Sequence, residues 1–543
     1  MPDTVTNSSA TLKSTARPGK IDVRYVAGFS VLVLAGSVAT LYPIFSLGCL
    51  TVAVVLGVCW LVFVWVRGTR LEFWQILALT ALSGYLVLNY GFDNLAVHVG
   101  GFPILISYGM MYTALALAVS GCWHLVVRAL NEPALLCVLA VLVLALFHMV
   151  TDVPSYGAWA FRDCTMCFDG LFLLMGLLWA MKSDSIYFLA KWLMFIFVMN
   201  MVYSFTLPWG ETLWSWSPVS GAFIQVPLLG NYNGAGDLLF AGATFCICVG
   251  SYVISRPRWL TPFLAVTQLL GIAITQVRRM YLGIVVVILI LILVGEIKKF
   301  AKLFILVPAA MAVLFAVTTL GGLEITGRIG PVNLAFFRDH IRSMSGTEVE
   351  DTPGSSVQSR ITMGDEAIRH FLANPVFGEG FGRPLLDSAI ATDETTGAVT
   401  RMPHNSSLTY LARLGVVGIV VWIAFHFCLL KRFFYAFRQR HSCDKRLYAL
   451  ALWFFLFYVI FMIGSFVEGP FEYPSRAIPF YFLMGSALGL IRWHLPVTTK
   501  SERRSTALAN SVGKVYLQSV SQLESRGLMY FLGNRTTWKD EEL

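Results

Sequence analysis

The sequence predicts an all-α integral membrane protein that crosses the bilayer many times. Of its 543 residues, 57% are apolar and only 13% are charged, and the mean hydropathy is +0.70, outside the usual range of soluble proteins. Apolar runs of about 17 to 25 residues, long enough to cross ~30 Å of hydrocarbon as helices, recur along nearly the whole chain. Together these observations exclude a soluble globular protein.

We expect about fourteen transmembrane helices from these runs. They form one block at 25–321 and a second at 406–494, separated by a long loop at 322–405 and flanked by an N-terminal segment at 1–24 and a tail at 495–543. The expected spans are 25–42, 45–66, 73–91, 102–127, 133–151, 166–181, 185–205, 233–254, 259–277, 280–296, 303–321, 406–430, 447–467 and 476–494.

The distribution of basic residues predicts the orientation of these spans. The N-terminal segment is polar and no small-residue cleavage pattern follows the first apolar run, so we expect a retained first span and a cytoplasmic N-terminus. Alternation from there places most of the 40 Lys and Arg residues in cytoplasmic segments, including the cluster from Arg432 to Arg446, as the positive-inside rule requires. This bias explains the net charge of +9 and leaves no indication of nucleic-acid binding.

The long loop at 322–405 then faces outside, and we expect it to carry short helices. Its stretch "SRITMGDEAIRHFLANPVFGEGFG" has apolar residues at helical spacing followed by a Pro- and Gly-rich turn, which predicts an amphipathic helix headed by Arg360 and ending near Asn374. Loops of this length are usually functional. A second amphipathic helix is expected on the membrane surface at 512–532, in the cytoplasmic tail.

The ten Cys residues are scattered, mostly within spans, where a thiol behaves as a small apolar group. Cys164 and Cys167 fall at the outer start of the sixth span. We expect two unlinked thiols or a minor disulfide there, since a zinc half-site would need a second half nearby.

Arginines on the outer side have two interpretations. Arg278 and Arg279, between the spans at 259–277 and 280–296, either anchor the headgroup region or capture an anion, because guanidinium groups bind phosphate oxygens in pairs at the face where a lipid diphosphate presents its charge. Arg360 is a further candidate for this role. The loop also holds Arg369, Arg383 and Arg401, any of which could be a solvated surface residue.

His404 stands at the mouth of the span at 406–430. A His in this place is often a cap or an interfacial residue, although Ser406 or Ser407 is expected to cap this helix. The helix dipole would disfavour the imidazolium form, and a neutral imidazole near pH 7 is what a general base requires. Gly415 and Gly418 would allow another helix to approach closely.

Three motifs in order carry a resemblance to a known family. "HNSSLTYLARLGVVG" fits in full the His-Asn, nine residues, Gly-x-x-Gly pattern of bacterial O-antigen ligases, and "TQVRRMYLG" resembles the Thr-x-Ser-Arg stretch of the O-antigen ligase and polymerase superfamily. The stretch beginning at Arg360 resembles the superfamily's Arg-led helix ending in Asn-Pro-x-x-Gly-x-Gly-x-Gly. Asn233 is similar to a family Asn that opens a span. Val277 replaces the usual Ser, and a second Arg follows Arg278, which leaves the register between the two arginines open.

The resemblance implies a membrane-embedded glycosyltransferase, similar to the GT-C class, that uses no metal or cofactor. It implies a glycan donor linked to undecaprenyl diphosphate, a glycolipid or glycan acceptor, and an active site on the periplasmic side of the bacterial inner membrane. Matching positions imply catalytic roles for Arg278, Arg360 and His404. We further expect Arg279, Asn405, Arg383, Gly378 and Gly380 to bind substrate. A single displacement with inversion is the expected reaction.

The sequence leaves the acceptor open. A lipid A-core sugar would make the protein a ligase, a second lipid-linked glycan a polymerase, and a protein Ser or Thr an oligosaccharyltransferase; the pattern at His404 favours the ligase. A lipid-linked-sugar transporter is the alternative from another class, but such proteins usually show internal repeats and polar sites in mid-membrane. Here the charges within spans are few, namely Lys191, Asp237 and Arg413.

Overall fold

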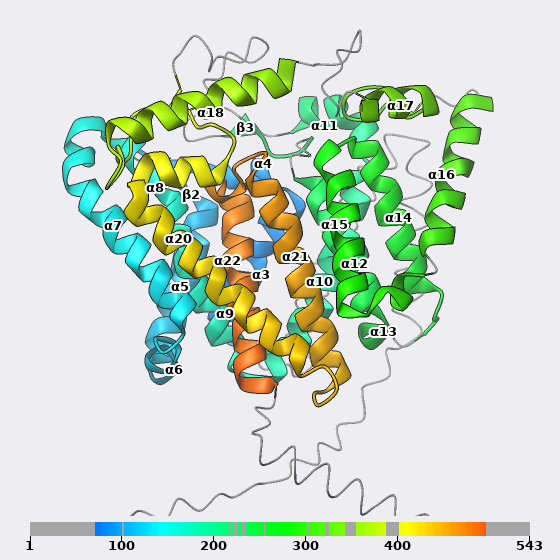
Figure 1. The fold of residues 1–543 in the computed structure, drawn as a ribbon, viewed down its shortest axis with the longest axis horizontal. Helices are drawn as coiled ribbons and strands as arrows, with labels where there is room; N and C mark the ends of the chain where they lie inside the picture. Colours follow the sequence, from blue (N-terminus) through cyan, green and yellow to red (C-terminus); the bar gives the residue numbers. More distant parts are fainter. Residues whose placement is uncertain are drawn as a thin grey trace, which may run out of the picture.

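The computed structural model describes residues 71–99, 102–217, 219–220, 226–230, 232, 234–254, 256–301, 303–320, 325–342, 355–386 and 401–495. Within these ranges the chain is predominantly helical (Figure 1). The helices are α3 (Phe73–Val87), α4 (Tyr90–Asp93), α5 (Ile106–Gly121), α6 (Trp123–Ala129), α7 (Pro133–Tyr156), α8 (Ala158–Phe168), α9 (Phe172–Ala180), α10 (Ser183–Ser204), α11 (Gly210–Trp216), α12 (Ala235–Cys248), α13 (Gly250–Val253), α14 (Leu260–Thr275), α15 (Arg278–Val294), α16 (Leu303–Leu320), α17 (Leu334–Arg342), α18 (Ser355–Ala373), α20 (Ser406–Arg438), α21 (Lys445–Ser465) and α22 (Pro474–Gly489).

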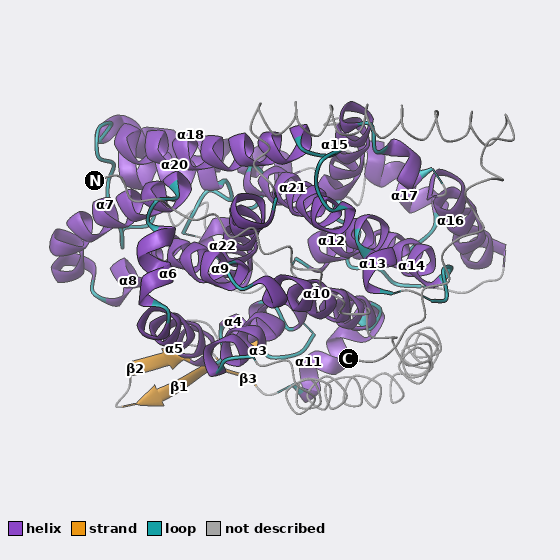
Figure 2. Ribbon diagram, turned by 90° about the horizontal axis from the view of Figure 1, so that it is seen from below, coloured by secondary structure: helices purple, strands orange, loops and turns teal. Residues whose placement is uncertain are grey.

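Most of these helices run between two opposite ends of the molecule, while α17 and α18 lie across one of the ends (Figure 1). Seen from below, they form one continuous bundle with a small hairpin at its margin (Figure 2). In that hairpin β1 (Ala96–Val99) pairs antiparallel with β2 (Phe102–Leu105). A second short pair joins β3 (Val219–Ser220) to β4 (Val226–Pro227). Irregular segments and strands therefore occupy the ends and edges of a helical bundle.

Glycines allow α9 and α22 to pack backbone against backbone at the centre. A side chain at Gly176 would collide with the carbonyl oxygen of Phe482, and one at Gly485 would collide with that of Leu173. Helices in membranes associate through such small residues because lipid supplies no hydrophobic force between them. These two positions hold α22 in place, and α22 carries a site residue in its first turn.

Aromatic rings join α10, α12 and α21. The ring of Trp453 on α21 lies 5.7 Å from that of Phe197 on α10 and 4.9 Å from that of Phe245 on α12. Its indole N–H donates a hydrogen bond to the carbonyl oxygen of Ala241 at 2.9 Å, which satisfies the one polar atom of this buried ring. The contact fixes α12 against α21 below the candidate site.

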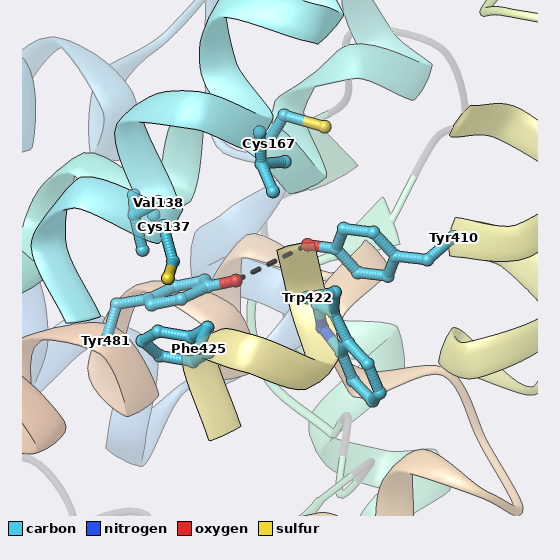
Figure 3. Close-up of a pocket in the computed structure, with 9 residues that line it drawn as sticks. Cys137, Val138, Cys167, Tyr410, Trp422, Phe425 and Tyr481 are labelled. Carbon is cyan, nitrogen blue, oxygen red and sulfur yellow. Dashed lines mark hydrogen bonds between the residues drawn. The ribbon is translucent and has the colours of Figure 1, made fainter. Parts of the chain in front are cut away.

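A seam between α7, α8, α20 and α22 holds a cavity of only about 10 Å³ (Figure 3). The hydroxyl oxygens of Tyr410 and Tyr481 lie 3.4 Å apart across it, with Cys137 and Trp422 among the lining residues. A cavity needs about this much space for a single water. The seam is therefore a packing gap in the core and is too small for a sugar or a lipid.

Helix α20 is interrupted at Gly415, where φ is 63°. The loop after α18 inserts its backbone at this break: Val416 N–H donates to the oxygen of Pro375 at 2.9 Å, and Glu379 N–H donates to the oxygen of Ala412 at 2.9 Å. A side chain at Gly415 would collide with Val376. The close approach predicted for Gly415 exists, but the approaching backbone belongs to this loop and not to another helix.

The expected spans from residue 73 onward each coincide with a helix or with consecutive helices. Five described helices are long and apolar enough to cross a membrane, or six if the bent pair of α5 and α6 is one span; α3, α12, α14 and the first part of α16 are shorter apolar helices. The spans expected at 25–42 and 45–66, and the surface helix expected at 512–532, lie outside the described residues. The predicted helical, multi-span character is thus confirmed for the part of the chain that can be described.

Two expected segments differ from the structure. The span predicted at 102–127 begins as strand β2, and its helical part bends by 97° between α5 and α6. The loop helix predicted to be headed by Arg360 begins earlier, at Ser355, and ends at Ala373 as expected. Apolar content locates such segments, but it does not distinguish a strand from a helix over a few residues.

Candidate active site

Hydrogen bonds at the junction between α14 and α15 attach part of the long loop to the bundle. Gln276 adopts a positive φ of 51°, which is uncommon for a residue with a side chain. Its Oε1 accepts hydrogen bonds from the backbone N–H groups of Ile329 at 2.7 Å and Gly330 at 3.0 Å. This contact brings Arg328 within the electrostatic influence of Arg279, in the first turn of α15.

Arg279 is buried and neutralised by two carboxylates. Its Nε lies 3.1 Å from Oδ1 of Asp237 and its Nη2 lies 2.6 Å from Oδ2, a bidentate pairing. Its Nη1 forms a further ion pair with Glu468. A buried guanidinium requires such partners, and the planar fork matches a carboxylate in this geometry. Arg279 therefore ties α15 to α12 and to the turn between α21 and α22.

Arg476, in the first turn of α22, shares one of these carboxylates. Its Nη1 lies 2.5 Å from Oε2 of Glu468. Gly234, which precedes α12 with φ 86°, leaves space for the guanidinium: a Cβ there would lie 3.1 Å from Nε of Arg476. Arg476 was not predicted from the sequence; it is the first residue of the span expected at 476–494. A charged residue at the end of an apolar run was the available signal.

Five guanidinium groups influence one another at this end of the bundle. Partial desolvation lowers the pKa of Arg360, although its side chain is exposed, and the charges of Arg279 and Arg278 lower it further. Partial desolvation also lowers the pKa of Arg328, likewise exposed, with contributions from Arg279 and Arg476. We call Arg278, Arg279, Arg328, Arg360 and Arg476 the arginine cluster. The five arginines carry three more charges than the two carboxylates, Asp237 and Glu468, that neutralise them among the described residues. This positive surplus favours binding of an anion.

His404 lies beside this cluster, directly before α20. Its φ is 50°, in the left-handed region, and its side chain is partly buried. Burial lowers the pKa of His404, and the charges of Arg360 and Arg476 lower it further, so the imidazole is neutral at pH 7. The pKa shift has the expected direction, but its causes are burial and the charges of the two arginines, where the sequence suggested the helix dipole.

Asn405 caps α20, and the expected caps Ser406 and Ser407 do not. The side-chain oxygen of Asn405 accepts a hydrogen bond from the backbone N–H of Leu408 at 3.2 Å, and its amide donates to the oxygen of Phe466 at 3.2 Å. The hydroxyl of Ser406 instead accepts from the backbone N–H of Phe471 at 3.4 Å. Asn405 thus joins the start of α20 to the turn after α21, which sets His404 beside the cluster.

Gly378 and Gly380 both have positive φ values, 79° and 80°. A side chain at Gly378 would collide with the backbone of Arg413, and one at Gly380 would collide with the carboxylate of Asp152. Asp152 also accepts a hydrogen bond from the backbone N–H of Phe381 at 2.7 Å. Both glycines therefore have a packing role where the loop enters the break in α20, and their predicted role in substrate binding stays a prediction.

Arg413 anchors the same loop from within α20. It is fully buried, its Nη2 lies 3.0 Å from Oδ2 of Asp163, and its Nη1 donates to the oxygen of Gly380 at 3.0 Å. Arg401 donates to the oxygen of Gly382 at 2.6 Å. Arg383 forms its ion pair with Glu379, at 2.6 Å, on this docking loop. The charge within the span thus has a structural partner, as buried charges in membranes usually do.

The structure brings four of the predicted site residues together, namely Arg278, Arg279, Arg360 and His404, with Asn405 adjoining. The other three, Arg383, Gly378 and Gly380, lie on the docking loop. Asn233 lies outside the described residues. Cys164 and Cys167 are buried in α8 and form no disulfide. Over the described part of the chain, no group of three or more His, Cys, Asp or Glu side chains is arranged to hold a metal ion.

The fold and the site define a multi-pass helical membrane protein with a cationic cluster next to a neutral imidazole. Residues 263–423 match the family model described as O-antigen ligase. Over these residues the match supports the predicted O-antigen ligase and polymerase superfamily. Members of that family are glycosyltransferase-like ligases or polymerases, and the family implies lipid-linked glycan substrates. Asp237, Glu468 and Arg476 lie outside the matched range. No curated protein matches the chain.

Proposed function

We propose that the protein transfers a glycan from undecaprenyl diphosphate to a hydroxyl group of a lipid A-core sugar. The observation that carries this proposal is the convergence of the arginine cluster and His404 from separate parts of the chain. The proposal includes about fourteen membrane crossings of a GT-C-like protein in the bacterial inner membrane, with the loop at 322–405 and the active site on the periplasmic side.

The arginine cluster binds the diphosphate of the donor. Arg279 is already held by two carboxylates, so Arg278 and Arg360 are the members assigned to the phosphate oxygens, with Arg476 beside them. When the bond between the sugar and the diphosphate breaks, negative charge grows on the phosphate. Fixed guanidinium groups in a partly buried site stabilise that charge without reorganising. Residues Asp237 and Glu468 hold the cluster in position.

His404 acts as the general base. The acceptor hydroxyl oxygen attacks the anomeric carbon, its proton passes to the neutral imidazole, and the bond from that carbon to the diphosphate oxygen breaks with its electron pair on the leaving group. Undecaprenyl diphosphate leaves, and the anomeric configuration inverts because there is a single displacement. The lowered pKa of His404 supports this assignment, since it keeps the imidazole available to accept a proton.

A polymerase is the second candidate, because the matched family supports ligase and polymerase activities alike. In that case the attacking hydroxyl belongs to another lipid-linked glycan, and the same groups act in the same roles. The His-Asn, nine residues, Gly-x-x-Gly pattern at His404 favours the ligase. The protein acceptor of an oligosaccharyltransferase would be a Ser or Thr hydroxyl.

A reconstitution of the full chain in proteoliposomes tests these functions. Purified protein is given an undecaprenyl-diphosphate-linked glycan with a lipid A-core acceptor, a second lipid-linked glycan, or a Ser/Thr-containing peptide, and products are identified by mass spectrometry. We expect glycosylated lipid A-core, absent from the His404→Ala protein. Products made only from two lipid-linked glycans would identify a polymerase. Movement of the donor across the bilayer without any transfer would identify a transporter.

A further inference from the structure

A cavity lies at the end of the bundle away from α17 and α18, between the start of α7 and the last turns of α20. Figure 1 shows this end of the molecule, where α6 and the C-terminal part of α20 lie, opposite α18. The cavity has a volume of about 380 Å³, within the range of small-molecule sites. It shares no residue with the arginine cluster or with His404, so the proposed reaction leaves it unassigned.

The inner walls of this cavity are apolar. Pro133 of α7 faces Phe427, Cys428 and Phe434 of α20. The side chains of Phe427 and Phe434 are 66% and 64% exposed, on a helix long and apolar enough to cross a membrane. Phe427 lies within the expected span at 406–430, where an exposed ring meets hydrocarbon, and Phe434 lies just beyond it at the membrane surface, so the cavity offers an acyl chain an apolar path that ends at the headgroup level.

The rim of the cavity is strongly basic. Glu132 is fully buried and is paired with Arg432, at 3.1 and 2.9 Å, and with Arg492, at 2.9 Å. Lys431 and Arg438 are exposed at the same rim, and neither forms an ion pair with a described residue. This end of the cavity thus has four basic side chains and one carboxylate, so it keeps a net positive charge after Glu132 has been neutralised.

Tyr435 adds an unused polar atom to this rim. Its hydroxyl is shielded from solvent and has no hydrogen-bond partner among the described residues, although its ring lines the cavity. A shielded hydroxyl without a partner is costly. A ligand oxygen at the rim would satisfy it.

We propose that this cavity binds one anionic diacyl phospholipid of the bilayer, with the phosphate at Lys431, Arg438 and Tyr435 and an acyl chain along Phe427 and Phe434. Basic pockets at the ends of membrane helices suit anionic headgroups, and each basic side chain near the surface contributes to the attraction. The combination of an apolar wall and a cationic rim favours a lipid over a soluble anion, because a soluble anion has no acyl chain to contact the apolar wall. It favours an anionic lipid over a zwitterionic one, whose headgroup has no net charge.

The test measures lipid binding to the purified full-length protein by native mass spectrometry. Dioleoyl phosphatidylglycerol and dioleoyl phosphatidylcholine, which share their acyl chains, are added separately to the parent and to a Lys431→Gln/Arg438→Gln variant. We expect the parent to prefer phosphatidylglycerol and the variant to bind it on the order of tenfold or more weakly, as the loss of two basic side chains predicts. Equal binding of phosphatidylglycerol by both proteins would overturn the proposal.

Two matched controls make the result specific. Lys445→Gln/Arg446→Gln removes the same charge from exposed residues at the start of α21, which do not line the cavity, and this protein should keep the preference. Cys428→Trp fills the cavity while keeping the rim charges, and it should lose bound phosphatidylglycerol. Retained binding in the filled variant, tight binding of glycerol 3-phosphate, or displacement of phosphatidylglycerol by equimolar undecaprenyl phosphate would each show that a diacyl lipid is not the occupant.

Discussion

Arg279 binds Asp237 through two parallel hydrogen bonds, Nε to Oδ1 at 3.1 Å and Nη2 to Oδ2 at 2.6 Å, whereas the adjacent Arg278 is only partly buried and has no ion pair with a described residue. Two neighbouring arginines therefore occupy different environments. We infer that Arg279 maintains the geometry of the site and that Arg278 is the one available to a phosphate.

The first prediction separates these two arginines. Arg279→Ala leaves the Asp237 carboxylate without its buried partner, which should cost about 3–5 kcal/mol of stability and lower the thermal unfolding temperature of the detergent-purified protein. Arg278→Lys keeps the charge but loses the bidentate fork, so it should unfold like the parent and lose donor kcat/KM. Normal turnover of Arg278→Lys would favour headgroup anchoring for Arg278. An unchanged unfolding temperature of Arg279→Ala would contradict the structural role of Arg279.

The second prediction concerns the general base. General base catalysis typically contributes ~10²–10⁴-fold, so His404→Ala should lose about that factor in kcat while donor binding, a function of the arginines, stays close to that of the parent. His404→Gln should not recover activity, because an amide does not accept a proton at neutral pH. A Gln variant that turns over like the parent, at matched expression and folding, would identify His404 as a positioning group.

The third prediction links Arg360 to the pH dependence of the reaction. The charge of Arg360 lowers the pKa of His404, so kcat/KM, which reports the free enzyme, should fall only as pH drops below the reference value of ~6.5. Removing that charge in Arg360→Gln should raise the pKa of His404 and move the acid limb of the profile to higher pH. Arg369→Gln, on the same helix but paired with Glu366, is the control and should leave the limb unchanged. If the acid limb of the kcat/KM profile lies at the same pH in the parent and in Arg360→Gln, Arg360 does not belong to the site.

The fourth prediction uses Glu472, which forms a hydrogen bond with Thr409 of α20. Burial raises the pKa of Glu472 to about 8, so the folded state favours its protonated form. Its contribution to stability is complete below the unfolded pKa of ~4.3 and is lost as pH rises toward about 8. Thermal unfolding temperatures at several pH values across this window should fall for the parent and fall less for Glu472→Gln. Parallel curves for the two proteins would show that this carboxyl does not titrate on unfolding.

The fifth prediction is topological. Both termini and the segment at 431–446 should be cytoplasmic and the loop at 322–405 periplasmic, because the basic residues concentrate on the assigned inner side. A membrane-impermeant maleimide added to intact spheroplasts should label Ser355→Cys above the background of the parent, and should label Lys445→Cys only after the cells are opened. Labelling of position 355 only from the cytoplasmic side would reverse the orientation.

The sequence by itself determined the helical membrane class and the positions of the motifs. Apolar length sets where helices can cross a bilayer, and that constraint is local, so most of the described segments fall where they were expected. The sequence also identified Arg278, Arg360 and His404 as candidate site residues, because short motifs of fixed spacing can be recognised without a structure. It assigned a capping role to Ser406 or Ser407 and missed the cap at Asn405, since either choice satisfies the same local pattern.

Only the tertiary structure decided how these residues are held. Asp237 meets Arg279 from another helix, Asp152 holds the backbone of Phe381 across 229 residues of sequence, and Arg476 joins the cluster from the first turn of α22. Such contacts depend on which helix faces pack together, which no local pattern specifies. The difference between a neutralised Arg279 and an available Arg278 arises from that packing, because adjacent residues on a helix point in directions about 100° apart.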